Sequence, residues 1–511
     1  MQNNDKKVLL RISNLKQYFP LKGGRFVKAN DGISLDIYEG ETFGLVGESG
    51  CGKSTLGRTI LQLYHQTYGR TMYYGRSLDD LAPKYVIDTV KNLKSRRAKL
   101  HELEQKRDKL EAEYAKLSET EQYAKHTELD TARKLAEDAL LDITKIVGGF
   151  LVVDNLDPVI AAYSKDYAIA HNLSSMEEKR QELQVDVDDA EYAKKTAEKA
   201  GKSAKDGQLQ RAQEKLKQCD DQIAALRAQL NAGRKEIEAL RAPYANDPEF
   251  QKYEAYRDDG IDLARLEYNE MRRLRSDMQL IFQDPYSSLN PRMSVGQIIS
   301  EGMQAHNMIK KKDARMQEMV LKIMDDCGLA PYFLHRFPHQ FSGGQRQRIG
   351  IARALATNPK FVVCDEAVSA LDVSIQAQII NLLLDLKEHQ NLTYMFITHD
   401  LSVVKYISDR VGVMYLGTMV ELAAADEIFH HPIHPYTEAL LNAIPTTDTV
   451  GAKELSILEG DIPSPVNPPK GCKFHTRCKY CTEICTQVVP EWEEVRPNHF
   501  VACHHKLEVK E

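Results

Sequence analysis

The residues from Gly47 to Ser54 have the spacing of a phosphate-binding loop. They read Gly-Glu-Ser-Gly-Cys-Gly-Lys-Ser, follow the apolar, strand-like segment 43–46 and precede the helix-forming segment 55–61. In such a loop the glycines let backbone N–H groups turn toward a phosphate, the Lys53 ammonium reaches the β- and γ-phosphate oxygens, and the Ser54 hydroxyl binds Mg²⁺. The chain is therefore predicted to bind a nucleotide. The predicted contact residues are Gly47, Glu48, Ser49, Gly50, Cys51, Gly52, Lys53, Ser54 and Thr55.

A second candidate site for an anion lies in the run Phe341 to Arg348. There a serine and two glycines open an amphipathic helix, and a helix N-terminus of this kind favours negative charge. A single nucleotide domain has nothing obvious for a second phosphate site to bind. The run resembles the signature motif of ABC-type ATPases, which closes over the γ-phosphate of ATP held by the other subunit. The resemblance implies a dimer with two nucleotides at its interface, contacted by Ser342, Gly343, Gly344 and Gln345.

Two carboxylates end the apolar segment 361–364. Asp365 would hold the shell of a Mg²⁺ ion, and Glu366 would orient and deprotonate the attacking water. Such a pair at a strand end can also be no more than a helix cap. The order of the motifs favours the catalytic interpretation, because phosphate loop, glutamine, signature, carboxylate pair and histidine follow one another as in ABC ATPases.

The same resemblance assigns roles to further residues. Gln283, which ends an apolar stretch, matches the glutamine that reads Mg²⁺ and water and signals to a membrane partner. His399 follows a strand-like segment and looks like the histidine that contacts the γ-phosphate. Asp372 lies in what looks like the loop that crosses the dimer interface. For adenine, alignment with the family favours stacking on Phe19 over Tyr18, although either ring could instead belong to a strand core.

Length and composition are those of a cytosolic enzyme with more than one domain. The 511 residues would form about three domains at roughly 150 residues each. A net charge of -6 and a pI near 6.3 give no reason to expect nucleic acid binding. No apolar run approaches the roughly 18 residues that span a bilayer, and residues 1–7 lack the apolar centre of a signal peptide. If the chain acts at a membrane, we expect it to contact partners embedded there.

A long insertion separates the phosphate loop from Gln283. Roughly 190 residues intervene where an ABC ATPase needs only a short stretch, far beyond ordinary loop lengths. From about 86 to 240 the sequence is rich in Lys, Glu, Ala and Leu, and a heptad repeat in its second half predicts a helix that pairs with another helix. The alternative is a solvated, charged helix without a partner. The repeat comprises Leu209, Leu216, Ile223, Leu230 and Ile237, with Ala212, Cys219, Leu226, Gly233 and Leu240 three residues later.

The first half of the insertion can supply the partner helix. It carries Leu103, Leu110 and Leu117 at heptad spacing and, after a phase shift, a second apolar series from Leu129 to Ile146. Between the halves, the segment 147–158 breaks the helical pattern with Gly-Gly and Asp-Pro pairs, which predicts the tip of one antiparallel hairpin. Arms of about 35 to 60 residues would project on the order of 50 to 90 Å.

Five of the nine cysteines lie close together near the C-terminus, after the proline-rich segment 462–469. In a reducing cytosol such a group favours a metal site over disulfides, because thiolates bind zinc and iron–sulfur clusters strongly. Disulfides or unliganded thiols are the alternative. The five are Cys472, Cys478, Cys481, Cys485 and Cys503.

The C-terminal sequence resembles one particular family of ABC ATPases. Segments 431–437 and 463–478 closely resemble the C-terminal extension of oligopeptide and dipeptide importer ATPases, and 282–292 looks like the second of the two ATPase subunits in such importers. The resemblance covers about residues 8–80 and 271–505. In that family, cysteines matching Cys472, Cys478, Cys485 and Cys503 are implied to hold a four-iron four-sulfur (4Fe-4S) cluster, with Zn²⁺ as the alternative.

Two residues depart from the family pattern. Cys481 stands where a small residue is usual, which makes the ligand set ambiguous. Ala367 stands where a proline normally follows the catalytic glutamate, and we expect activity to survive because Glu366 itself is present. The family assigns no role and no partner to the insertion.

These features predict an α/β protein with a RecA-like P-loop ABC ATPase core, a small antiparallel β subdomain, an inserted antiparallel helical hairpin and a cysteine-rich C-terminal extension. The resemblance implies an ATP-hydrolysing subunit of an oligopeptide or dipeptide importer at the cytoplasmic face of the cell membrane. Its implied partners are a second ABC ATPase subunit in a heterodimer, two transmembrane permease subunits and an extracytoplasmic peptide-binding protein. The expected divisions are 1–80 and 271–445 for the ATPase domain, 81–270 for the insertion and 446–511 for the extension.

The competing class is a soluble ABC ATPase of chromosome maintenance or DNA repair, which also projects a coiled coil. In that class the coil follows the glutamine loop and carries a Cys-x-x-Cys motif or a hinge at its tip. Here the insertion precedes Gln283 and its predicted tip has no cysteine. A non-catalytic regulatory subunit is disfavoured by the intact Lys53 and Glu366.

Overall fold

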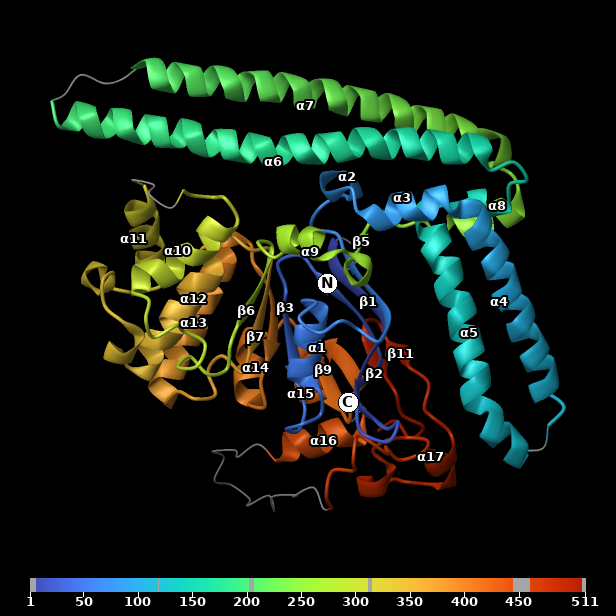
Figure 1. Ribbon diagram of the computed structural model, residues 1–511. Coiled ribbons are helices and arrows are strands. Elements are labelled where there is room, and N and C mark those ends of the chain that lie inside the picture. The colour runs from blue at the N-terminus through green and yellow to red at the C-terminus, as the bar shows by residue number, and fades with distance from the viewer. Residues whose placement is uncertain (1–5, 118, 202–205, 311–314, 444–459, 508–511) are drawn as a thin grey trace. The chain divides into compact units, whose positions relative to one another are not determined.

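The computed structural model describes residues 6–117, 119–201, 206–310, 315–443 and 460–507 (Figure 1). The chain forms two compact units, one of Met1–Gly75 with Met271–Glu511 and the other of Arg76–Glu270. We call them the core unit and the insertion unit. The expected insertion 81–270 lies within the insertion unit, which starts at residue 76. The expected boundary between 445 and 446 lies outside the described residues.

A mixed sheet lies at the centre of the core unit. In the described part of this unit, eight strands follow one another in the order β11, β12, β10, β9, β3, β8, β7 and β6. The run from β9 to β6 is parallel, and β10, β12 and β11 continue it in antiparallel pairing. The bounds are β3 (Thr42–Val46), β6 (Met278–Ile281), β7 (Phe361–Asp365), β8 (Thr393–Ile397), β9 (Arg410–Tyr415), β10 (Thr418–Ala424), β11 (Glu493–Arg496) and β12 (His499–Val501).

The parallel strands are covered on both faces, which is why the sequence shows them as short apolar runs. Every residue of β3, β7 and β8 is buried. Helix α1 (Lys53–Ile60) packs on β7 and β8, α12 (Gly343–Leu355) on β6 and α14 (Leu401–Ile407) on β3. Because these strands are parallel, their C-terminal ends meet at one edge, which is where open α/β sheets bind ligands.

An antiparallel sheet forms a second layer of the core unit. In it β1 (Val8–Pro20) lies between β2 (Phe26–Tyr38) and β4 (Tyr68–Tyr73). A helical layer follows β6, and its apolar residues join those of β7 and β8 in one core that includes Ile299, Met324 and Ile379. The remaining helices of the core unit are α10 (Val295–Ala305), α11 (Met316–Asp326), α13 (Val373–Gln390), α15 (Ala425–His430), α16 (Pro435–Asn442) and α17 (Glu483–Gln487).

The C-terminal extension continues the central sheet through β12, where Val501 pairs with Glu421 of β10. The Glu421 carboxylate is fully buried and accepts hydrogen bonds from the backbone N–H of Ile433 at 2.8 Å and of His434 at 3.0 Å. Its Oε1 also lies 2.8 Å from Nε2 of His499. Burial lowers the pKa of His434 to about 4, so that imidazole is neutral near pH 7. The extension is thus attached to the sheet by buried polar contacts.

The insertion unit contains two helical hairpins. Helix α4 (Leu93–Tyr114) pairs with α5 (Glu119–Val147), and α6 (Asp157–Lys199) pairs with α7 (Asp206–Arg241) (Figure 1). The short helices α2 (Leu78–Leu81) and α3 (Lys84–Lys91) pack on α6. The unit also includes α8 (Pro248–Glu254) and β5 (Ile261–Asp262), and α9 (Tyr268–Leu274) crosses its boundary. Among the described residues, no helix is both long and apolar enough to cross a membrane.

The prediction of a single hairpin with its tip at 147–158 is wrong. The heptad positions Ile223 and Leu230 are buried as a seam should be, but their partner helix is α6 rather than the first half of the insertion. Residues 148–152 form a short 3₁₀ helix in which Phe150 is only 1% exposed and packs edge-on against Phe250 and Tyr163. A segment this apolar is more stable buried than at a solvent-exposed tip, and the chain reverses direction after α4 and after α6 instead.

Candidate active site

The phosphate loop begins directly after β3 and continues into the first turn of α1. Gly47 and Gly52 have φ of +149° and +103°, which L side chains rarely adopt. A Cβ atom at Gly47 would lie 2.2 Å from the Met414 carbonyl oxygen, and one at Gly52 would lie 2.2 Å from that of Ala29. Only glycine therefore fits these two positions, where the loop passes close to neighbouring backbone.

The Lys53 ammonium lies inside the loop, and its side chain is largely buried. Its Nζ donates to the carbonyl oxygens of Gly47 at 2.7 Å and Glu48 at 3.1 Å. Within the part of the chain that the structure describes, no carboxylate forms an ion pair with it. Nζ of Lys53 also lies 3.8 Å from Sγ of Cys51. A buried cation whose partners are neutral carbonyls and a thiol is suited to an incoming phosphate.

Ser54 and Asp365 meet where α1 begins and β7 ends. The Ser54 hydroxyl donates to Oδ1 of Asp365 at 2.5 Å, and Nη2 of Arg58 donates to Oδ2 at 3.1 Å. The Asp365 side chain is only 1% exposed. A hydroxyl and a carboxylate are oxygen donors of the kind Mg²⁺ prefers, so this pair fits the predicted metal-binding residues.

Glu366 lies at the next position, beyond the end of β7, with a left-handed φ of 47°. Its Oε2 accepts a hydrogen bond from Nε2 of Gln283 at 2.5 Å, and its Oε1 lies 3.5 Å from Nδ1 of His399. Gln283 follows β6 and His399 follows β8, the two neighbours of β7. The structure thus brings two predicted residues, Gln283 and His399, to the carboxylate of a third, an arrangement that can hold a water molecule and accept its proton.

The signature residues and Asp372 lie at the starts of two other helices. Ser342 caps α12, where its hydroxyl accepts from the Gln345 N–H and the Gln345 side chain accepts from the Ser342 N–H. Gly344 packs on Ile375 of α13, and Asp372 caps that helix. Among the described residues, no hydrogen bond or ion pair joins the signature residues or Asp372 to the phosphate loop. They form a separate edge of the core unit, made of two helix N-termini of the kind that favours anions.

The two candidate aromatic residues lie side by side in β1. The Tyr18 hydroxyl donates to Asp31 at 2.5 Å, and burial together with this bond raises the pKa of Tyr18. The Phe19 ring meets Tyr64 edge-on, with centroids 5.3 Å apart. Because Tyr18 is already bound through its hydroxyl, Phe19 remains the better candidate for stacking.

Four cysteines of the extension interact electrostatically. Burial raises the pKa of Cys472 to about 11 and of Cys503 to about 12, and the thiols of Cys478 and Cys485 add to both shifts. The N–H of Cys472 donates to the Cys485 carbonyl at 2.8 Å. Cys481 is exposed. Across the described ranges, no three His, Cys, Asp or Glu side chains are arranged to hold a metal ion, although four gathered thiols have the donor chemistry of a zinc or iron–sulfur site.

Sequence reasoning missed three residues of this site. Arg58 follows Ser54 by one helical turn, and that spacing could have placed both on the Asp365 side of α1. Arg477 and Tyr436 contact Glu48 of the loop from the C-terminal part of the chain. They are far from the loop in sequence, and no local pattern indicates those contacts.

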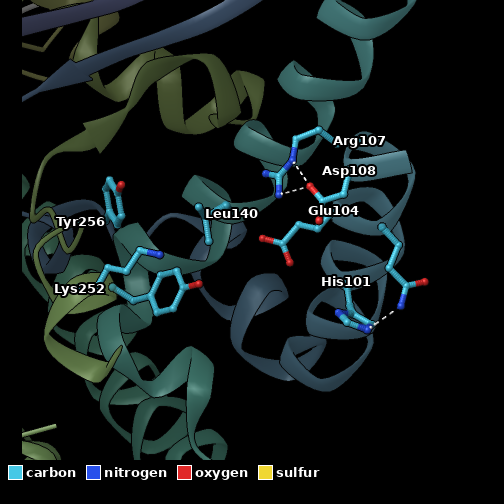
Figure 2. A pocket seen from close by; sticks show the side chains of 9 residues that line it. His101, Glu104, Arg107, Asp108, Leu140, Lys252 and Tyr256 are labelled. Atoms are coloured by element: carbon cyan, nitrogen blue, oxygen red, sulfur yellow. Dashed lines mark hydrogen bonds and ion pairs between the residues drawn. The ribbon is translucent and has the colours of Figure 1, made fainter. Parts of the chain in front are cut away.

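A pocket of about 390 Å³ lies in the insertion unit between α4, α5 and the end of α8 (Figure 2). Its polar residues bond to one another, Arg107 to Asp108 and His101 to Gln105. None of the predicted site residues lines this pocket.

Two family models match this sequence. The model described as ABC transporter matches residues 30–251 and 250–369. The model described as oligopeptide/dipeptide transporter, C-terminal region, matches residues 420–485. Together the two matches include the phosphate loop, the carboxylate pair and four of the extension's five cysteines.

Several curated proteins are similar to this chain. The oligopeptide transport ATP-binding protein AppF of Bacillus subtilis is 52% identical over 250 residues, 48% of this chain and 75% of its own. OppF of Salmonella typhimurium, with the same description, is 52% identical over 48% of this chain and 73% of its own. The putative oligopeptide transport ATP-binding protein YkfD of Bacillus subtilis is 34% identical over 97% of this chain and 95% of its own, an alignment that must include the insertion unit.

Among solved structures, cbiO1 from Clostridium perfringens, part of the ABC transporter complex cbiONQ, aligns over 83% of this chain and 92% of its own at 16% identity and a TM-score of 0.42.

Proposed function

This chain belongs to the ABC transporter ATPases and carries the C-terminal region of the oligopeptide/dipeptide transporters, and on that premise we propose that it is the subunit that hydrolyses ATP to power peptide import. One observation carries the proposal. At one edge of a parallel sheet, a phosphate loop with a buried lysine lies beside a carboxylate that contacts both Gln283 and His399.

The residues divide the work of hydrolysis. Lys53 exchanges its two carbonyl partners for β- and γ-phosphate oxygens, and the loop N–H groups bind the same phosphates. Glu366 accepts the proton of the attacking water, which Gln283 and His399 help to orient. Ser54 and Asp365 would hold Mg²⁺, which would neutralise charge on the phosphates.

The position of the signature residues, away from this chain's own phosphate loop, supports a dimer. Ser342, Gly343, Gly344 and Gln345 lie at a helix N-terminus that makes no hydrogen bond or ion pair with the described residues of this chain's own loop. A second ATPase subunit would present its bound ATP to this edge, and Asp372 would lie at the same interface. Closure of the two subunits around two ATP molecules, followed by hydrolysis and reopening, would drive two transmembrane permease subunits that receive peptide from an extracytoplasmic binding protein. The chain would lie against the cytoplasmic face of the membrane.

The extension is proposed to hold a metal group through Cys472, Cys478, Cys485 and Cys503. What supports this is that the thiols of Cys478 and Cys485 add to the raised pKa of both Cys472 and Cys503, and that the set contains only soft donors. A 4Fe-4S cluster, or a zinc ion as the alternative, would cross-link segments of the extension that have little core of their own. Cys481 is left out because its thiol is exposed.

The insertion unit is proposed to contact a partner chain rather than take part in hydrolysis. All residues assigned to the chemistry belong to the core unit. The competing class, a soluble ATPase of chromosome maintenance or DNA repair, is not favoured, because the C-terminal region of peptide transporters is present.

Purification from membranes tests the proposal. We expect the chain to bring down a second ATPase subunit and two permease chains, and the reconstituted complex to take up peptide only with hydrolysable ATP. Recovery of nucleic acid or chromosome-associated chains, with no permease, would contradict it.

A further inference from the structure

We infer that Arg477 of the C-terminal extension is a positioning residue for ATP binding, because it neutralises a carboxylate that belongs to the phosphate loop itself. The inference rests on the proposed function, since it concerns the same nucleotide site. The carboxylate is that of Glu48, the second residue of the loop, which a polyanionic ligand must approach. Left unpaired, this charge would repel the phosphates of ATP.

Arg477 forms a bidentate ion pair with Glu48. Its Nη1 lies 2.7 Å from Oε2 and its Nη2 lies 2.9 Å from Oε1. The Arg477 side chain is only 4% exposed and that of Glu48 is 23% exposed. The hydrogen bonds to Glu48 raise the pKa of Arg477 further above its usual value. A paired, mostly buried arginine of this kind is a fixed feature rather than a mobile surface contact.

Glu48 is contacted through each of its polar groups. Its N–H donates to the Tyr436 hydroxyl at 2.9 Å. Its carbonyl oxygen accepts from Nζ of Lys53 at 3.1 Å and from the N–H of Cys51 at 3.2 Å. Glu48 thus connects Arg477 to Lys53, the lysine proposed to bind the phosphates. The position of the Glu48 side chain affects the Glu48 carbonyl oxygen, whose hydrogen bond Lys53 must give up when it binds phosphate.

The segment just before Arg477 is held in place by packing and by an ion pair. Phe474, three residues earlier, is 2% exposed and packs against Tyr415 and Tyr436 with ring centroids 5.2 Å apart in both cases. Lys473 donates to Asp31 at 3.2 Å, and Asp31 also accepts from the Tyr18 hydroxyl. The extension therefore contacts the phosphate loop at one point and, at another, β2, which pairs with the strand of the candidate adenine-binding residues.

A charge-balance experiment on the full-length protein, with its partners, tests the inference. Arg477→Ala should raise the Kd for Mg-ATP about tenfold and raise KM similarly, with kcat changed by less than about twofold. The decisive variant is Arg477→Ala with Glu48→Gln, which removes the unpaired charge. It should bring the Kd back to within about threefold of the wild type, and the loss in Arg477→Ala should shrink at high salt.

The matched control is Lys479→Ala, two residues away, because Lys479 is 63% exposed and pairs with Glu438 outside the loop. Lys479→Ala should leave the Kd for Mg-ATP unchanged.

Iron content and melting temperature are measured for every variant, and if Arg477→Ala does not fold, Arg477→Gln replaces it. A Kd for folded Arg477→Ala within about twofold of wild type, or a loss that Glu48→Gln does not reverse, overturns the inference. If the wild type itself binds no ATP, the proposed function falls with it, whereas failure of Arg477→Ala alone leaves that function standing.

Discussion

Gln283 donates a hydrogen bond from Nε2 to a carboxylate oxygen of Glu366 at 2.5 Å, which joins the ends of two neighbouring strands, β6 and β7. Nδ1 of His399, which follows β8, lies 3.5 Å from the other carboxylate oxygen of Glu366. These contacts fix the orientation of the proposed proton acceptor at the ends of three parallel strands.

Glu366→Gln should still bind ATP but lose at least about 100-fold in turnover, because a positioned base contributes at least that much. Gln keeps the size of the side chain and one of its two acceptor oxygens but cannot take the proton. The measurement is phosphate release by protein free of wild-type subunits, with ATP affinity as the control. Wild-type turnover in this variant would show that another group is the base.

Lys53→Ala should weaken ATP binding by about tenfold or more, because it removes a charge-assisted hydrogen bond to phosphate. The side chain is buried among backbone carbonyls, so its loss leaves those acceptors unpaired. Calorimetric titration with Mg-ATP measures the effect, and Lys53→Arg tests whether charge alone restores binding. An unchanged Kd would mean that ATP does not occupy this loop.

Protein purified without oxygen should be brown and contain about four iron atoms per chain, as a cubane cluster with thiolate ligands requires. Cys485→Ser should lower the iron content, whereas Cys481→Ser should not, since the Cys481 thiol is exposed. Metal analysis and visible absorption make the measurement. Colourless protein with one zinc per chain would favour the tetrahedral alternative.

Removal of the insertion unit should leave ATPase activity largely intact. The unit has hydrophobic clusters of its own, and joining Gly75 to Met271 through a short Gly/Ser linker removes none of Lys53, Gln283 and Glu366. Peptide uptake and recovery of partner chains should fall instead. Loss of ATPase would show that the unit is needed for the core to fold, and unchanged uptake and partners would mean that it is a tolerated insertion.

Asp166→Asn should stabilise the protein at neutral pH. Burial, with the nearby Asp79 carboxylate adding to it, raises the pKa of Asp166 to about 6, and Arg234 offsets this only in part. A pKa raised above its unfolded value means that ionisation opposes folding, so the cost is absent below about pH 4 and complete above about pH 6. After allowance for solvent exposure, the gain at pH 7.5 should be on the order of 1 kcal/mol.

Denaturant unfolding of the full chain at pH 7.5 and pH 4.5 would measure this gain. At pH 4.5 the advantage of Asp166→Asn should shrink toward zero. Asp154→Asn, at an exposed position of the same unit, is the control and should change stability little at either pH. An equal gain at both pH values would show that charge is not the cause.

The strands of the site could be predicted because each is buried on both faces. The apolar runs before Gly47, Gln283 and His399 correspond to β3, β6 and β8, and Asp365 lies at the end of β7. The partner of the heptad helix could not be predicted, because a row of apolar residues such as Ile223 and Leu230 specifies a seam but not which helix fills it. Nor could Arg477, whose partner Glu48 is 429 residues away, since an ion pair leaves no periodic pattern in either segment.

The place of β3 between β8 and β9 has a consequence for synthesis of the chain. The strands beside β3, β8 and β9, begin at Thr393 and Arg410. During synthesis β3 therefore cannot pair with them until most of the protein has been made. Meanwhile the insertion unit can fold around its own clusters, and the Lys84 N–H bonds Glu270 near its two ends at 2.7 Å. Once folded, it spares the chain the entropy of closing a loop of that length, which grows by about 0.6 kcal/mol for each doubling. A unit that carries none of the proposed catalytic residues thus shortens the search by which the strands of the site find one another.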